Sequence, residues 1–230
     1  MTTTQGRPGV DLPDRRGRTG LDRVGRDLTG NPDVRVVDVE LLASSWHVLR
    51  RTTLEVRRRD GRWTTTERET YDRGDGAVVV PYDLERGTVL LTRQFRYPAY
   101  VNGHPTGMLV EAAAGLLDAD DPATAMRREA AEELGVGLGE LQLVFTAYMS
   151  PGSVTEKLFC YVAPYRAADR VSEGGGVEDE GEDVEVLEVP FAEALEAVRT
   201  GEIADAKTIM LLQWLERGVD WPAATGSAAP

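Results

Sequence analysis

Three glutamates fall within five positions of the stretch RREAAEELG, residues 127–135. If this stretch is helical, Glu129 lies three and four residues from Glu132 and Glu133. Like charges at these spacings destabilise a helix by roughly 0.2–0.5 kcal/mol per pair. A divalent cation would offset the repulsion, because hard cations bind carboxylate oxygens. The spacing therefore points to metal chemistry, although an amphipathic helix with a solvated acidic face would show the same pattern.

A second acidic cluster, EDEGED at residues 178–183, lies far from the first in the sequence. Two carboxylate clusters brought close together would repel each other unless cations lay between them. We therefore expect the fold to bring the two clusters together around metal ions. The alternative for the second cluster is a solvated loop.

Capping residues define the helix that carries the first cluster. Asp121 suits an N-cap, Pro122 suits the first helical position and Gly135 suits the position after the last turn, which predicts a helix over 122–134. We expect Ala125, Met126, Ala130 and Leu134 to supply its apolar packing. The small residues of AAAGLLD, just before the helix, allow close backbone approach.

The remaining pattern predicts a mixed α/β (α+β) fold. Hairpin strands are expected between residues 34 and 75, followed by strands at 77–83, 87–95, 107–115, 141–149, 156–166 and 184–190. Helices are expected near 191–199 and 206–217. We predict an α/β/α sandwich around a mixed sheet, preceded by a small N-terminal antiparallel β-sheet. The expected organisation is a disordered tail at 1–33, the small sheet at 34–75, the main domain at 76–218 and a flexible tail at 219–230.

Composition narrows the class of protein. The net charge of −13 is uneven: residues 1–101 carry +3 and residues 102–230 carry −16. An acidic half does not favour nucleic acid, no apolar run is long enough for a membrane helix, and no secretory signal is visible. A single cysteine, Cys160, cannot form an internal disulfide, so we expect a cytoplasmic protein in which this residue is buried.

The stretch GLLDADDPATAMRREAAEELGV, residues 115–136, resembles the signature of the Nudix hydrolases. The residues that match the signature are Gly115, Arg128, Glu129, Glu132, Glu133, Gly135 and Val136. The sequence departs from the general signature in two ways. Asp121 replaces an early glutamate, and the stretch from Asp121 to Arg128 is one residue shorter than in the general pattern. The motifs RQFR, YMSPGSVTE, GGGVEDE, VEVLEVPF and TGEIADAKT further resemble the group that hydrolyses GDP-mannose and ADP-ribose, from about residue 46 to about residue 215.

The resemblance implies a Mg²⁺ site, with Mn²⁺ possible. It assigns metal binding to Glu129, Glu133 and the backbone carbonyl of Ala114, and a supporting role to Glu132. A final carboxylate, a metal ligand or general base, comes from the second cluster. It is either Glu180 or Glu182, and we favour Glu182. The resemblance also implies that Arg128 is structural: it pairs with a carboxylate of the signature and holds the helix in register. Structural roles are likewise implied for Gly115, Asp121 and Gly135.

The same resemblance suggests substrate-binding residues. They are Trp46, Glu67, Arg68, Glu69, Arg96, Glu156 and Lys207. Alternatives are a core tryptophan for Trp46, a surface ion pair for Arg96 and a purely structural lysine for Lys207. It also implies a homodimer in which the N-terminal strands of one subunit complete the site of its neighbour.

Three functions remain open. The first is Mg²⁺-dependent hydrolysis of a nucleoside diphosphate sugar, with GDP-mannose giving GMP and mannose 1-phosphate. The second is hydrolysis of ADP-ribose by the same chemistry. The third is a non-catalytic Nudix module that senses a nucleotide, which the retention of all three helix glutamates argues against.

Overall fold

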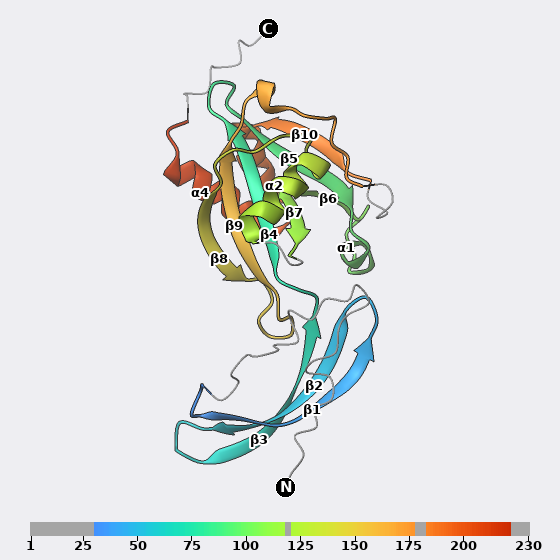
Figure 1. Ribbon diagram of the computed structural model, residues 1–230, viewed down its shortest axis with the longest axis vertical. Coiled ribbons are helices and arrows are strands. Elements are labelled where there is room, and N and C mark those ends of the chain that lie inside the picture. Colours follow the sequence, from blue (N-terminus) through green and yellow to red (C-terminus); the bar gives the residue numbers. More distant parts are fainter. Residues whose placement is uncertain (1–29, 118–120, 178–182, 222–230) are drawn as a thin grey trace. The chain divides into compact units, whose positions relative to one another are not determined.

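The computed structural model describes residues 30–117, 121–177 and 183–221 (Figure 1). These residues form two compact units. The first contains the described residues up to Asp75 together with Tyr148–Lys157, and the second contains Gly76–Ala147 and the described residues from Leu158 onward.

The first unit is built on an antiparallel sheet with the strand order β1-β2-β3. Its strands are β1 (Val34–Ser44), β2 (Val48–Arg57) and β3 (Trp63–Asp72). The turn between β2 and β3 includes Asp60, whose carboxylate accepts a hydrogen bond from the Arg62 amide at 3.1 Å, and Gly61, whose φ is 86°. The predicted small antiparallel sheet is therefore confirmed.

A buried polar cluster joins the segment Tyr148–Lys157 to this sheet. Arg50 of β2 forms an ion pair with Asp72 at the end of β3, and both side chains are buried. The Thr155 hydroxyl donates to Asp72 at 2.7 Å, and the Lys157 amide donates to Asp75 at 2.9 Å. Since each buried charge has a partner, the cluster avoids the cost of isolated buried ions.

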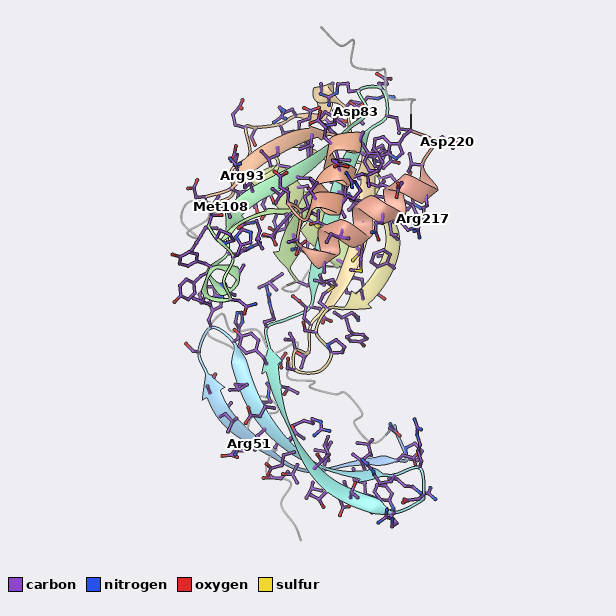
Figure 2. All side chains as sticks on the ribbon, turned by 180° about the vertical axis from the view of Figure 1, so that it is seen from behind. Arg51, Asp83, Arg93, Met108, Arg217 and Asp220 are labelled. Carbon is purple, nitrogen blue, oxygen red and sulfur yellow. The ribbon has the colours of Figure 1, made fainter. Side chains whose placement is uncertain are left out.

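The second unit is a mixed sheet with helices on both faces. Its strands are β4 (Gly76–Asp83), β5 (Thr88–Phe95), β6 (Met108–Glu111), β7 (Ala113–Leu116), β8 (Gln142–Tyr148), β9 (Lys157–Pro164) and β10 (Glu185–Pro190). The last residue of β8 and the first residue of β9 belong to the first unit. The helices are α1 (Tyr97–Val101), α2 (Pro122–Glu133), α3 (Phe191–Thr200) and α4 (Ala206–Gly218), with a short 3₁₀ helix at Ala167–Asp169. The main strand order is β10-β5-β4-β9-β8, in which β4 and β9 are parallel while β5 is antiparallel to both β4 and β10. Helix α2 lies on one face of the sheet (Figure 1) and α4 on the other (Figure 2).

The core lies between the sheet and these helices. Alternate residues of a strand point to opposite faces, so Ala77 and Val79 of β4 face the same side. They share a buried cluster with Met126, Ala130 and Leu134 from the α2 region. The predicted apolar face of this helix, its start at Pro122 and the α/β/α sandwich are confirmed.

The strand expected at 107–115 is wrong in one respect, because it is broken at Ala112. Strand β6 pairs with β5, whereas β7 pairs with β4. The chain changes partners at Ala112, and the amide of that residue donates instead to the Thr208 hydroxyl at 2.7 Å. Helix α1 was also not predicted by the sequence pattern. In the described part of the chain, no helix combines the length and apolar character that crossing a membrane requires.

Candidate active site

Helix α2 is fixed at its first turn by Asp121. The Asp121 carboxylate accepts hydrogen bonds from the amides of Ala123 at 3.1 Å and Thr124 at 3.2 Å. Hydrogen bonding from Thr124 lowers the pKa of Asp121, since it favours the charged form. Aspartate therefore performs the capping role at the position where the signature usually has a glutamate.

Glu129 projects from α2 onto the backbone of β7 at Gly115. A Cβ atom added to Gly115 would fall closer than 3.0 Å to the Cγ and Cδ atoms of Glu129. A larger residue at this position would therefore displace the Glu129 carboxylate from its place against β7. This contact accounts for the close backbone approach that the small residues before the helix predicted.

Glu133 also reaches β7 and is 3% exposed. Its Oε2 atom accepts a hydrogen bond from the Ala114 amide at 3.1 Å. Glu129 and Glu133 therefore contact neighbouring residues of one strand. A buried carboxylate requires compensation by hydrogen bonds or cations, so this position is suited to a metal ligand.

Glu132 lies on the more exposed side of the helix, next to Arg128. The Arg128 guanidinium lies 3.2 Å from Glu129 and 3.8 Å from Glu132. This arrangement places a positive charge between two of the three glutamates and reduces their mutual repulsion.

A glycine-rich segment closes the C-terminal end of α2 and leads into the second acidic cluster. The amides of Gly175 and Gly176 donate to the carbonyls of Glu133 and Glu132 at 3.0 and 3.1 Å. These carbonyls have no partner within the helix, so the segment satisfies them. The Val184 amide returns to the Gly175 carbonyl at 3.0 Å, which brings the two ends of the acidic segment together.

Two glycines allow this close packing. Gly135 has a φ of 70°, and the Val171 amide donates to its carbonyl at 2.7 Å. Gly174 has a φ of 74°, and a Cβ atom there would lie 2.5 Å from the Glu133 carbonyl oxygen. The base of the acidic segment is thus fixed beside Glu132 and Glu133. Glu180 and Glu182 themselves lie outside the described residues.

The donor set of α2 suits Mg²⁺, because Glu129 and Glu133 supply hard carboxylate oxygens. Within residues 30–117, 121–177 and 183–221, no three His, Cys, Asp or Glu side chains are grouped as metal ligands.

Arg96 and Lys207 contact the same buried carboxylate. Glu111, at the end of β6, is 3% exposed and accepts from Arg96 Nε at 2.6 Å and from Lys207 Nζ at 2.7 Å. Lys207 also donates to Asp205 at 2.8 Å. Arg96 therefore makes an ion pair, but with a buried partner rather than on the surface.

Sequence reasoning missed Glu111 and Asp205. The signal for Glu111 was a single charged residue within the apolar stretch GMLVEAAAG. A charge in such a position indicates a buried partner, because an unpaired buried carboxylate is costly. The partners themselves could not be identified, since Lys207 is far away in the sequence.

The other predicted substrate residues lie in the first unit. Trp46, in the connection between β1 and β2, is 52% exposed, so the alternative of a core tryptophan is wrong. Glu156 is 9% exposed, and its carboxylate lies 3.4 Å from Arg73.

Strand β3 carries the remaining three predicted residues, and all are exposed. Glu69 forms an ion pair with Arg51 at 3.1 Å, and Arg68 donates to the Glu67 carbonyl at 2.7 Å. Because neighbouring residues of a strand alternate, Arg68 lies on the opposite face of the sheet from Glu67 and Glu69.

Comparison with known proteins gives two family matches. Residues 72–212 match the model of the NUDIX domain, and residues 33–71 match the GDP-mannose pyrophosphatase NudK N-terminal domain. A GDP-mannose pyrophosphatase of Cronobacter sakazakii is 50% identical over 188 residues, covering 81% of this chain and 97% of the relative. One from Pectobacterium atrosepticum is 48% identical over 191 residues, covering 80% of this chain and 98% of the relative.

A solved structure described as an ADP compounds hydrolase has the same fold. Its TM-score is 0.61 at 21% sequence identity, and the match covers 81% of this chain and 96% of that chain. At this level of identity the likeness supports the architecture.

Proposed function

The chain belongs to the Nudix hydrolases, and from this premise we propose that it hydrolyses GDP-mannose to GMP and mannose 1-phosphate. The observation that carries the hydrolytic function is the placement of Glu129 and Glu133 against Gly115 and Ala114. The choice of substrate is supported by the relatives named GDP-mannose pyrophosphatase, which match over nearly their full lengths. It is also supported by the match of residues 33–71 to the GDP-mannose pyrophosphatase NudK N-terminal domain.

In the proposed site, Glu129, Glu133 and the carbonyl of Ala114 bind Mg²⁺, and the segment 178–182 adds a carboxylate. We retain Glu182 in preference to Glu180 for that role. Bound Mg²⁺ would neutralise phosphate charge and acidify a water molecule. Mn²⁺ takes similar oxygen ligands and is the alternative metal.

The side chains of the protein position the diphosphate and the attacking water. Arg96 and Lys207 bind phosphate oxygens, for which a guanidinium is well suited because it can form two parallel hydrogen bonds. The loop carboxylate accepts the proton from the water. Glu132 and Arg128 keep the charges of the helix balanced, so that Glu129 stays directed toward β7.

The first unit supplies the proposed contacts to the nucleoside and sugar. Trp46 stacks on the base, since an exposed indole offers a large flat surface. The polar contacts come from Glu67, Arg68, Glu69 and Glu156. We also propose a homodimer in which these residues complete the site of the neighbouring subunit, and a cytoplasmic location.

The test is turnover by the purified protein. GDP-mannose and ADP-ribose are supplied separately with Mg²⁺, Mn²⁺ or excess EDTA, and nucleotide products are separated by anion-exchange chromatography. We expect metal-dependent release of GMP, with the larger kcat/KM for GDP-mannose. Faster hydrolysis of ADP-ribose would reassign the substrate. Tight binding of GDP-mannose without cleavage would instead identify a sensing module.

A further inference from the structure

The contacts of Glu111 suggest a role that the matching residues of the family signature do not include. We propose that Glu111 is a positioning residue, which holds Arg96 and Lys207 side by side as a paired cation site for the diphosphate. The inference rests on the proposed function, and deepens it by explaining how two cations distant in the sequence act on one substrate.

Each oxygen of Glu111 binds one of the two cations. Oε2 accepts from Arg96 and Oε1 accepts from Lys207, at 2.6 and 2.7 Å. The carboxylate is buried, whereas the Arg96 side chain is 39% exposed. Arg96 uses its Nε atom for this contact, and in the described part of the chain its terminal nitrogens make no other side-chain hydrogen bond. Those nitrogens are the ones suited to a phosphate group.

A second layer fixes Lys207 from the other side. Asp205 accepts from Lys207 at 2.8 Å and caps α4 by accepting from the Thr208 amide at 3.0 Å. The Thr208 hydroxyl donates to Asp205 at 2.6 Å and accepts from the Ala112 amide at 2.7 Å. Glu111 and Ala112 are consecutive, so both hold the start of α4 at the same place.

This arrangement connects the two cations to the proposed metal ligands. Glu111 binds the two cationic side chains, and a few residues later the same segment reaches the metal-site glutamates. Ala114 contacts Glu133, and Gly115 contacts Glu129. These five consecutive residues therefore carry both groups of contacts. A diphosphate has several negatively charged oxygens. A fixed distance between the proposed metal site and the side chains of Arg96 and Lys207 would preorganise the positive charges for these oxygens.

The charge balance supports positioning rather than direct substrate binding. Glu111 is itself negative and would repel phosphate, so it acts through the cations that it holds. Replacing it with glutamine preserves size but offers one acceptor and one donor in place of two acceptors. The Glu111→Gln variant should therefore misplace at least one of the two cations.

The decisive experiment measures binding in the absence of turnover. Calorimetric titration of GDP-mannose and of inorganic pyrophosphate is carried out with Mg²⁺ in a Glu133→Gln background, with and without Glu111→Gln. We expect Glu111→Gln to weaken the binding of both probes about 10- to 100-fold, as befits hydrogen bonds to charged groups. The same change in an Arg96→Ala background should have a clearly smaller effect, because residues that act together are not additive.

Asp83 provides a matched control (Figure 2). It is also a buried carboxylate of the second unit, 5% exposed, and Arg86 donates to it at 2.7 Å. Asp83→Asn should lower the melting temperature without changing either affinity. Unchanged affinity in Glu111→Gln, or equal effects with and without Arg96, would overturn the inference while leaving hydrolysis by the wild type intact.

A further measurement covers the case in which Glu111→Gln does not fold. Arg96→Ala, Lys207→Ala and the double variant retain Glu111, and pyrophosphate binding is measured for each. A shared carboxylate predicts non-additive losses, whereas strictly additive losses would overturn the inference. Failure of the proposed function shows separately, as absence of any metal-dependent product from the wild type.

Discussion

Glu133 is the most buried of the three helix glutamates, and its Oε2 atom accepts a hydrogen bond from the amide of Ala114 on β7. Burial removes water from a carboxylate, and hydrogen bonds or cations must compensate for that loss. The position is therefore suited to a cation, in contrast to Glu132, which retains substantial exposure.

Replacing Glu133 by glutamine tests this role. Glutamine can still accept a hydrogen bond from the Ala114 amide, so the fold should be retained. The loss of the negative charge should lower kcat at least ~100-fold, which exceeds the 10–100-fold effect typical of residues that only support metal ligands. Initial rates at saturating Mg²⁺ and a thermal melt provide the two measurements. Glu216→Gln, on the exposed side of α4, is the control and should retain wild-type rates. Wild-type turnover by Glu133→Gln would refute the assignment.

The environment of Cys160 predicts slow thiol chemistry. The side chain is fully buried in β9, and burial raises the pKa of its thiol from 9.0 to about 11. Folding therefore favours the protonated form; this contribution to stability is complete below pH 9 and is lost as the pH rises toward 11. At pH 8 the thiolate fraction is about 100-fold below that of an unfolded chain, so disulfide-exchange reagents should react at least that much more slowly before denaturation than after it. Rapid labelling of the native protein would contradict the burial, which the sequence had predicted.

At the scale of elements, local signals in the sequence were sufficient for α2 and insufficient for its surroundings. Asp121, Pro122 and Gly135 act within one turn of the helix, so they could be read directly from the sequence. The break at Ala112 depends on a change of strand partner and on Thr208, which lies in another helix. The shared use of Glu111 by Arg96 and Lys207 is likewise a product of tertiary structure. The resemblance suggested Arg96 and Lys207 as substrate-binding residues but did not indicate that both contact the same carboxylate.

The contact between Gly174 and the end of α2 gives an element-level prediction. In Gly174→Ala, the added Cβ would meet the Glu133 carbonyl oxygen at 2.5 Å in a backbone conformation with a φ of 74°. We expect a loss of about 1–3 kcal/mol in the free energy of unfolding, and a fall in kcat because the base of the acidic segment moves. Chemical denaturation and steady-state kinetics measure the two effects.

Gly201 is the matched control for that substitution. It follows α3 with a φ of 85°, and a Cβ atom there would meet nothing within 4 Å. Gly201→Ala should carry only the backbone cost of roughly 1–2 kcal/mol and leave kcat unchanged. Equal kinetics in the two variants would show that the contact at Gly174 has no part in catalysis.

At the scale of the whole molecule, the proposed function divides between two units. The helix glutamates and the paired cations belong to the second unit, whereas Trp46 and Glu156 belong to the first. The mixed α/β fold and the small N-terminal sheet followed from sequence patterning. The homodimer did not follow from patterning, because only the resemblance to the family implied it.

The proposed homodimer predicts a mass in solution. One chain has a mass of 25.1 kDa, so light scattering coupled to size-exclusion chromatography should give about 50 kDa across the concentration range used for kinetics. Trp46→Ala should retain that mass but raise KM for GDP-mannose about tenfold or more, since the stacking surface is lost. A monomer with full activity would rule out a site completed by a neighbouring subunit.

The hydrogen bond from Val184 to Gly175 has a consequence for divergence within the family. It joins the two ends of the acidic segment, while Gly175 and Gly176 anchor it to α2. Doubling the length of such a closed loop costs only about 0.6 kcal/mol in chain entropy. Insertions into this segment among relatives should therefore cost little stability and leave the register of α2 unchanged.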